Sequence, residues 1–275
     1  MKNLLHHALL TVLAALWLLP VLWMLLTSLG VDEGPNIRSF LPDGYTLRHY
    51  RELLLSPDSV SSFPQWFLNT LIVAVFTCFI STTLTLMTAY ALSFLRFRGR
   101  KALMNTALLL TLFPGFLGMI AVYFLLREIG LTNSLPGLIL VYSGGAGVNY
   151  LIAKGFFDTV SPSLREAAAL EGANEAVIFL QMILPLARPI VVYTIIQAFL
   201  TPWMDFVYAS ILLPSGISAD KTVALGLFSM VDKVNRNRYF AQFCAGGVIV
   251  SIPISLLFII MQRFYVEGVT AGAEK

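Results

Sequence analysis

Long apolar runs divide the chain, and shorter polar segments separate them. A helix of about 20 apolar residues is long enough to cross the hydrocarbon core of a bilayer. Six runs reach that length, at 8–29, 67–95, 102–126, 135–157, 190–213 and 240–262. The pattern predicts an all-α integral membrane protein with six transmembrane helices, forming a single domain over residues 1–275.

One polar segment differs from the others in its helix signals. Residues 161–189, between the fourth and fifth runs, read SPSLREAAALEGANEAVIFLQMILPLARP. Ser161 is suited to cap a helix that has Pro162 at its first position, and Ser163 with Glu166 three residues later matches a capping box. Either arrangement predicts a helix that begins near the start of this segment, and the pattern leaves both open.

The same segment contains signals for a turn and a second helix. Gly172 follows a run of strong helix formers and can adopt the left-handed conformation that ends a helix. Asn174 is a good cap for the next helix, and Pro185 and Pro189 mark its end and the entry to the fifth apolar run. The segment is therefore predicted to be a helix-turn-helix.

Two roles fit this helix-turn-helix on its pattern alone. Three alanines at 167–169 would let the first helix seat closely against another protein. An amphipathic helix on the inner membrane face is the alternative. Such a helix usually carries Lys and Arg for anionic lipids, whereas here three acids accompany Arg165, namely Glu166, Glu171 and Glu175. The pattern leaves docking and surface helix equally open.

Composition and charge narrow the class of protein. Charged residues make up 12% of the chain and hydrophobic residues 57%, whereas an ordinary soluble domain is about a quarter charged. The net charge of +3 is dispersed, which excludes nucleic acid as a partner and leaves membrane lipid. Cys78 and Cys244 lie in apolar runs and are interpreted as packing residues, and His6 and His7 as interfacial residues rather than metal ligands.

The short segment RFRGRK predicts the orientation of the chain. It places four cations, Arg96, Arg98, Arg100 and Lys101, between the second and third runs. Short loops rich in Lys and Arg face the cytoplasm. With six spans, both termini and residues 161–189 are then cytoplasmic, although the basic sequence KVNRNR in the predicted outer loop 214–239 runs against this bias. The first run is too long for the core of a signal peptide and is interpreted as a retained span.

The 161–189 segment resembles the EAA loop of ATP-binding-cassette (ABC) importer permeases. That pattern is E-A-A, three residues, G, nine residues and I-x-L-P. This chain has Glu166, Ala167, Ala168 and Gly172, followed by the sequence MILP at 182–185, with Met182 where Ile is usual. GFFDTVSPSLREAA before the loop, PWMDF at 202–206 and the tail QRFYVEGVTAGAEK are similar to the maltose/maltodextrin-type branch of carbohydrate importers.

The resemblance implies a role and a set of partners. In that family the EAA loop is a coupling helix seated in a cytoplasmic ATPase subunit, and ATP-driven closure of the ATPases moves the spans. The implied partners are a second, different permease subunit, two ATP-binding subunits that hold ATP and Mg²⁺, and an extracytoplasmic sugar-binding protein. The implied location is the cell membrane of a bacterium, and the implied cargo is a carbohydrate such as a malto-oligosaccharide.

The resemblance also transfers roles to individual residues. The implied coupling residues are Glu166, Ala167, Ala168, Gly172, Leu184 and Pro185. The tail 263–275 is expected to reach the ATPases through Gly268, Thr270, Ala271 and Gly272. The sequence has no G-x-x-x-x-G-K-[ST] phosphate-binding loop, so no nucleotide cofactor is expected on this chain itself. The three glycines Gly144, Gly145 and Gly147 are interpreted as helix packing or a local break.

Asp205 raises a second functional hypothesis. An ionisable residue inside a span usually faces the protein interior or a water-filled path. It would serve a proton-coupled secondary transporter, or it could tie neighbouring helices together by hydrogen bonds, which is the preferred interpretation. Candidate residues for a translocation path are Tyr123, Tyr142, Asn149, Tyr150, Gln197, Trp203 and Asp205. An intramembrane enzyme is not expected, because the spans supply no nucleophile-base pair or metal-ligand set.

Overall fold

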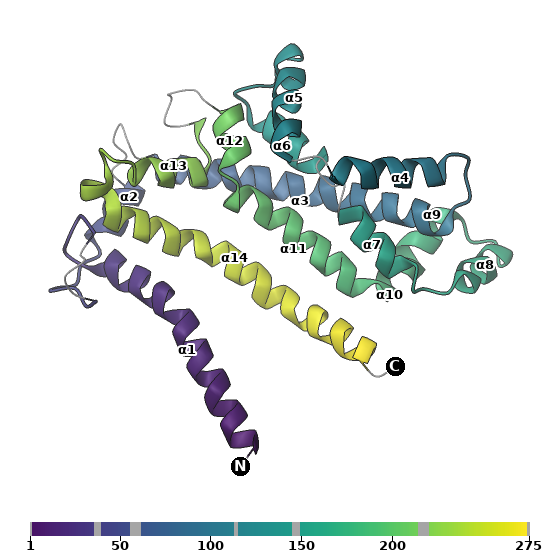
Figure 1. The fold of residues 1–275 in the computed structure, drawn as a ribbon, viewed down its shortest axis with the longest axis horizontal. Coiled ribbons are helices and arrows are strands. Elements are labelled where there is room, and N and C mark those ends of the chain that lie inside the picture. Colours follow the sequence, from purple (N-terminus) through teal and green to yellow (C-terminus); the bar gives the residue numbers. More distant parts are fainter. Residues whose placement is uncertain are drawn as a thin grey trace. The chain divides into compact units, whose positions relative to one another are not determined.

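The computed structural model describes residues 2–35, 40–55, 62–112, 115–144, 149–213 and 220–273, and its regular structure is helical (Figure 1). Within these ranges the sole β-type pairing is an isolated bridge between Gly30 and Tyr45. The all-α class is therefore confirmed. The chain divides into two compact units, one of residues 1–68 and 216–253 and the other of residues 69–215 and 254–275.

The first unit combines the N-terminal part of the chain with residues 216–253. It contains α1 (Lys2–Leu29), α2 (Arg48–Leu55), the start of α3 (Phe63–Phe94), α13 (Val223–Met230) and the start of α14 (Arg236–Ala273). Trp66 is completely buried in this unit. A Cβ at Gly226 would lie 2.0 Å from Cε3 of the Trp66 ring, so glycine at this position lets α13 pack directly on the indole.

Helix α2 and the residues before it form a hydrogen-bonded segment, here called the α2 segment (residues 30–55). Buried His49 lies with Nε2 2.9 Å from the Gly30 carbonyl oxygen. Tyr50 and Ser28 pair through their hydroxyls at 2.6 Å, and the Gln242 side-chain amide donates to Glu52 at 3.0 Å. Sequence analysis found no helix here, because a helix of eight residues depends on such distant partners.

Charge also orders the α2 segment. Arg48 donates to Glu52 at 2.6 Å and to Glu33 at 2.8 Å. The Arg48 guanidinium holds the pKa of the Glu52 carboxyl below its usual value, with a further contribution from the Gln242 hydrogen bond. Arg48 thus links α2 to the chain segment that precedes it.

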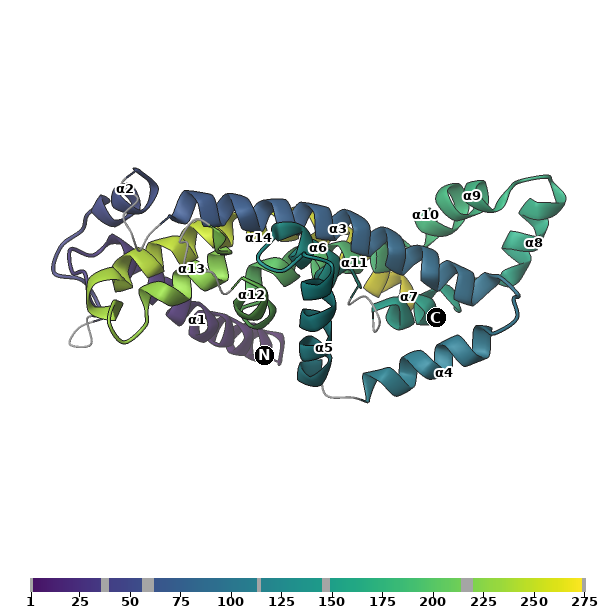
Figure 2. The same cartoon turned by 90° about the horizontal axis from the view of Figure 1, so that it is seen from above.

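The second unit contains the remaining helices. After the rest of α3 they are α4 (Arg100–Thr111), α5 (Gly115–Glu128), α6 (Leu135–Gly144), α7 (Asn149–Phe157), α8 (Pro162–Leu170), α9 (Glu175–Val177), a π-helical stretch (Ile178–Ile183), α10 (Leu184–Leu186), α11 (Arg188–Met204), α12 (Val207–Leu212) and the end of α14. Figure 2 shows α8, α9 and α10 beside the C-terminal end of α3.

Three of the described helices are long and apolar enough to cross a membrane: His6–Leu29, Phe63–Phe94 and Arg236–Gln262. The number rises to five if α6 with α7, and 175–186 with α11, each count as one bent span. The predicted run 102–126 corresponds to two helices, α4 and α5, and the run 190–213 to α11 and α12. Six spans within a single domain stay a prediction.

Candidate functional site

Residues 161–189, here called the 161–189 loop, form the predicted helix-turn-helix. Helix α8 has Pro162 in its first turn, as expected. Ser161 stands at the N-cap position with an extended backbone, but its side chain makes no capping hydrogen bond. Its hydroxyl lies instead 2.7 Å from the Ser163 hydroxyl. The start of the helix is therefore set by proline and backbone geometry rather than by a serine cap.

The turn after α8 follows the sequence signals closely. Gly172 has φ +87°, in the left-handed region where a side chain would be strained. Its N–H donates to the Ala169 carbonyl at 3.1 Å, and the Ala173 N–H donates to the Ala168 carbonyl at 3.0 Å. Asn174 then caps the next helix by accepting a hydrogen bond from the Val177 N–H at 2.9 Å. Both the glycine turn and the asparagine cap are confirmed.

The second helix of the loop runs from Glu175 to Leu186 and contains the π-helical stretch. It then turns by 89° into α11. The Ala187 N–H donates to the carbonyls of Ile183 and Leu184 at 2.9 and 3.2 Å, which closes the last turn. Leu184 is half-buried and Pro185 is exposed. The predicted boundary between the loop and the fifth apolar run therefore coincides with a sharp change of direction.

Apolar side chains attach the loop to the rest of its unit. Ala168, Ile178, Ile183 and Ala187 are buried in one cluster with residues from α3 and α7, namely Leu86, Ala89, Tyr90, Ala153 and Phe157. The rings of Tyr90 and Phe179 pack with their centroids 5.0 Å apart. Burial of this kind favours one position of the loop on α3 and α7, because each apolar contact removes surface from water.

A polar link reinforces the same attachment. The Tyr90 hydroxyl donates to Glu175 Oε2 at 2.5 Å, and Arg165 Nε donates to the same oxygen at 3.2 Å. Arg165 also pairs through Nη2 with Glu175 Oε1. One carboxylate thereby joins α8, α9 and α3. The charges of Arg165 and Glu175 were visible in the sequence, but their link to Tyr90 was not, since Tyr90 lies 85 residues before Glu175.

The opposite side of the loop carries small and charged residues and one large apolar residue, Leu170, which face away from this core. Glu166, Ala167, Ala169 and Gly172 are exposed, and Leu170 is 90% exposed. Of the predicted coupling residues, Ala168 is the one buried in the loop's own core. An exposed surface of alanine and glycine lets another backbone approach closely, because there is little side-chain bulk to hold it off.

Asp205 occupies the junction between α11 and α12. The Tyr142 hydroxyl donates to Asp205 Oδ2 at 2.7 Å. The Ala209 N–H donates to the same oxygen at 3.1 Å, and the Tyr208 N–H donates to Oδ1 at 3.4 Å. The carboxylate therefore caps α12 and ties it to α6, which is the hydrogen-bonding role preferred from the sequence.

The other path candidates do not converge on one place. Trp203 is buried and packs on Phe199 with ring centroids 6.0 Å apart. Gln197 is exposed, and Tyr123, Asn149 and Tyr150 are half-buried. Tyr208, which sequence analysis missed, packs edge-on against Tyr142 at 6.4 Å between centroids. The structure thus brings together Tyr142, Asp205 and Tyr208.

Several predicted residues fall at or beyond the edges of the described structure. Gly145 and Gly147 lie outside the described residues, although α6 ends at Gly144 as a local break requires. Gly268, Thr270, Ala271 and Gly272 lie on the end of α14, where the backbone is helical and the side chains are not described. Cys244 is buried and Cys78 half-buried. Among the described residues no group of three potential ligands could hold a metal ion.

Comparison with known proteins identifies the family. Residues 81–270 match the family described as "Binding-protein-dependent transport system inner membrane component". The galactooligosaccharides transport system permease protein GanQ of Bacillus subtilis is 35% identical over 100% of this chain and 96% of its own length. The maltodextrin transport system permease protein MdxG of the same organism is 30% identical over 97% of this chain and 94% of its own.

A solved structure has the same fold. It is a chain from the crystal structure of a bacterial ABC transporter involved in the import of the acidic polysaccharide alginate. The TM-score is 0.78 at 24% sequence identity, over 96% of both chains. The relatives named above are transport permeases rather than enzymes. The chain belongs to the inner-membrane permease family of binding-protein-dependent ABC importers.

Proposed function

We propose that this chain is a permease subunit of an ATP-driven oligosaccharide importer, that it forms half of the translocation pore, and that the 161–189 loop couples it to an ATPase subunit. The observation that carries the coupling role is the geometry of that loop. One side is anchored on α3 and α7, and the other exposes Glu166, Ala167 and Gly172. A docking helix needs both an exposed surface and an anchored one, because it must contact a partner on one side and move the helices that it packs against on the other.

The geometry supports docking over a helix that lies on the membrane. Arg165, the cation of α8, is already paired with Glu175. The exposed residues of α8 thus include an acid, Glu166, which anionic lipids would repel. Leu170 and the alanines offer a narrow apolar surface that suits a cleft in a protein.

The proposed assembly follows from family membership. It contains a second permease subunit, two ATP-binding subunits carrying ATP and Mg²⁺, and an extracytoplasmic sugar-binding protein. The chain would cross the membrane six times with both termini and the 161–189 loop in the cytoplasm. Residues 268–272 on the end of α14 would contact the ATPases. The loaded binding protein docks outside, ATP closes the ATPases, and the coupling helices open the pore outward.

The proposed cargo is an oligosaccharide. The sequence resemblance favours malto-oligosaccharides, and MdxG is named for maltodextrin. GanQ is named for galactooligosaccharides and is 35% identical over the whole chain. Both sugars therefore belong in the first transport assay. Tyr142, Tyr208 and Asp205 form a cluster of aromatic and polar groups of the kind that contacts sugars.

A proton-coupled transporter that uses Asp205 is not favoured. The matching family is that of a binding-protein-dependent transport component, and GanQ and MdxG are named as transport system permease proteins. The Asp205 carboxylate also accepts hydrogen bonds from Tyr142 and from two backbone N–H groups at the start of α12. A carboxylate held in this way serves the fold, whereas a proton carrier must be released in each cycle.

Reconstitution tests the proposal. The chain is co-expressed with its partner permease, ATPase and binding protein, and uptake of labelled malto- and galacto-oligosaccharides into proteoliposomes is measured with and without ATP. We expect uptake that requires ATP and every partner. Uptake driven by a pH gradient alone, or by this chain without an ATPase, would contradict it.

A further inference from the structure

The connection from α3 to α4, here called the basic segment (residues 95–101), concentrates positive charge. Arg96, Arg98, Arg100 and Lys101 lie within six residues, and within the described part of the chain none of them forms an ion pair. Arg100 is half-buried, whereas the other three are exposed. A guanidinium group that is partly removed from water favours an anionic partner, because the partner restores the interactions lost on burial.

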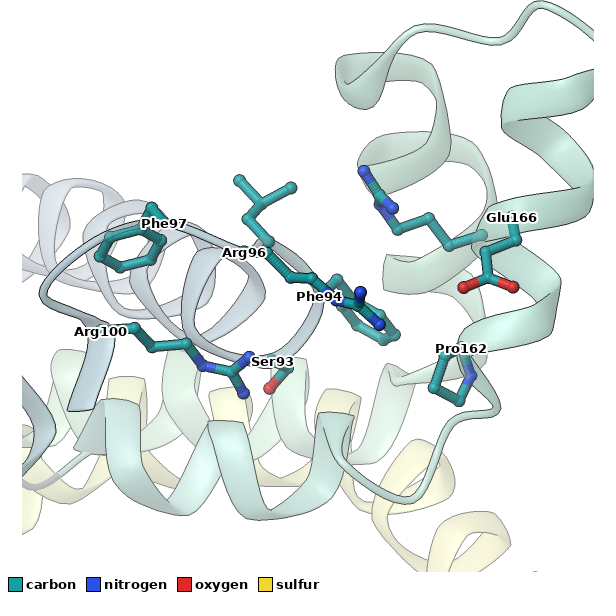
Figure 3. Close-up of a pocket in the computed structure, with 9 residues that line it drawn as sticks. Ser93, Phe94, Arg96, Phe97, Arg100, Pro162 and Glu166 are labelled. Carbon is teal, nitrogen blue, oxygen red and sulfur yellow. The ribbon is translucent and has the colours of Figure 1, made fainter.

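A cavity of about 880 Å³ lies between the basic segment and the start of α8, both of which belong to the second unit. Figure 3 shows Arg96 and Arg100 on the side of the basic segment, and Pro162 and Glu166 on the side of α8. The basic segment and the 161–189 loop are therefore two walls of one cavity.

Glu166 connects this cavity with the surface that we propose to contact the ATPase. It lines the cavity, and it is also one of the exposed residues of α8, beside Ala167. A partner that contacts this side of α8 therefore borders the cavity. Because the basic segment forms the other wall, the same partner lies within reach of its arginines.

The charges on the walls favour an acidic group of such a partner. Arg165 lines the cavity but is already paired with Glu175. The remaining charged groups are two arginines, Arg96 and Arg100, and one carboxylate, Glu166, so positive charge is in excess. A guanidinium group binds a carboxylate through two parallel N–H donors. Charges at protein interfaces are commonly complementary in this way.

The apolar part of the wall is attached to the core beneath the loop. Phe94 lines the cavity and is the last residue of α3. Its ring packs on Tyr90 with centroids 5.3 Å apart and on Phe157 with centroids 6.4 Å apart. Both partners belong to the cluster that anchors the 161–189 loop. A contact at the basic segment would therefore act on α3 directly, whereas a contact on α8 acts on α3 through the loop.

We propose that this cavity receives an acidic side chain of the ATP-binding subunit, held by Arg96 and Arg100, as a second contact beside the one proposed for the 161–189 loop. The inference rests on the proposed docking of that loop, which brings the ATPase to this surface. One contact on α8 and another at the end of α3 fix the orientation of the ATPase on the permease, because a single contact would let it pivot.

Binding of the purified ATP-binding subunit tests the second contact. The chain is purified together with its partner permease in detergent, and the dissociation constant of the ATPase is measured at low and high salt. Arg96→Gln/Arg100→Gln should raise this constant on the order of 10-fold at low salt, because an acidic group of the ATPase loses its partner. High salt should reduce the difference, since it screens the charges. Wild-type affinity in this variant would overturn the proposal.

A matched variant separates the cavity from general charge. Arg98→Gln/Lys101→Gln removes the same charge from the same segment, but neither residue lines the cavity. Its affinity for the ATPase should stay close to that of the wild type. Equal losses in the two double variants would assign the effect to net charge and overturn the proposal.

A zero-length cross-link tests the chemistry of the partner. Arg96→Lys/Arg100→Lys keeps the charge and supplies primary amines, which a carbodiimide joins only to carboxylates in direct contact. We expect mass spectrometry to find cross-links from positions 96 or 100 to an Asp or Glu of the ATP-binding subunit. Cross-links to Glu166 alone, with none to the ATPase, would overturn the proposal.

Ala167→Trp, on the exposed side of α8, separates this contact from the docking of the loop. Loss of ATPase affinity in Ala167→Trp but not in Arg96→Gln/Arg100→Gln would overturn the second contact and leave loop docking in place. If neither variant lost affinity, loop docking would be wrong as well. If the double variant kept its ATPase affinity but lost binding of inorganic phosphate in equilibrium dialysis, the cavity would hold a free anion instead.

Discussion

The 161–189 loop and the α2 segment both interrupt apolar helices with charged residues, yet they are held differently. In the α2 segment, His49, Tyr50 and Glu52 each bond to a part of the chain outside α2. The 161–189 loop is anchored through one face, by an apolar cluster and the Tyr90–Glu175–Arg165 link. Its other face remains exposed.

This difference separates two uses of a polar segment in a membrane protein. A segment whose polar groups are satisfied within its own unit closes and stiffens that unit. A segment with one anchored face and one bare face can pass a displacement from a partner to the helices beneath it. Changes in the first should therefore alter stability, and changes in the second should alter coupling.

The largest expected effect is at the turn of the 161–189 loop. Gly172→Val should abolish ATP-driven uptake while the chain still inserts in the membrane, because φ +87° strains a β-branched residue by about 1–2 kcal/mol. Proteoliposome uptake and membrane fractionation measure the two properties.

Two variants control for this substitution. Gly172→Asn should restore part of the uptake, since asparagine tolerates the left-handed region. Gly155→Val, at a site on α7 where an added Cβ meets no described atom within 4 Å, should leave uptake largely intact. Normal uptake in Gly172→Val would contradict a coupling role for the turn.

The next effect concerns the α2 segment and should appear in stability alone. His49→Leu leaves the Gly30 carbonyl without its side-chain partner and should lower the free energy of unfolding by about 1–3 kcal/mol. Thermal unfolding in detergent measures it. His7→Leu, at an exposed histidine of α1, is the matched control and should change little. If His49→Leu kept the wild-type free energy of unfolding but lost ATP-driven uptake, the proposed difference between the two segments would be wrong.

A smaller effect is expected for the link between the loop and α3. Tyr90→Phe removes one hydrogen bond to Glu175 and should weaken the attachment by about 1 kcal/mol or less, because the carboxylate is half exposed. Faster hydrogen exchange of the α8 amides would report it. In a double-mutant cycle with Glu175→Gln, the stability losses of the two single variants should not add up in the double variant. Full additivity would show that the hydrogen bond between Tyr90 and Glu175 contributes no free energy.

The smallest effect is a dependence on pH in the α2 segment. Since the pKa of Glu52 is lowered in the folded state, its contribution is present above the unfolded value of about 4.3 and is lost as pH falls through the folded value. Glu52→Gln should therefore cost about 0.5 kcal/mol at pH 7, and the difference from wild type should vanish in acid. Glu128→Gln, at an exposed acid of α5, is the control for the loss of one carboxylate and should leave the free energy of unfolding at pH 7 nearly unchanged.

Sequence analysis succeeded where the structure depends on near neighbours. Pro162 at the start of α8, the left-handed Gly172 and the Asn174 cap each act within a few residues, so their types were enough to predict the helix-turn-helix. The resemblance to the EAA loop then added the residues of the proposed coupling surface, because local sequence signals did not distinguish a docking helix from a helix on the membrane surface.

Contacts between residues far apart in the sequence could not be predicted in this way. Tyr90 meets Glu175 across 85 residues, and Gln242 meets Glu52 across 190. The break between α11 and α12 was also hidden, because the helices on both sides of Asp205 are apolar and one charged residue leaves the run long enough for a single span. Sequence analysis identified the charge of Asp205 but not the start of α12, which its carboxylate caps.

The 89° turn between the 161–189 loop and α11 has a mechanical consequence. Because the second loop helix and α11 are nearly perpendicular, the movement of α11 depends on whether the loop helix shifts or rotates. A shift of the second loop helix parallel to α11 acts as a piston and drives α11 along its axis, whereas a rotation of that helix about its own axis makes α11 swing like a lever. Buried Ala187 lies at this corner, where the two helices meet.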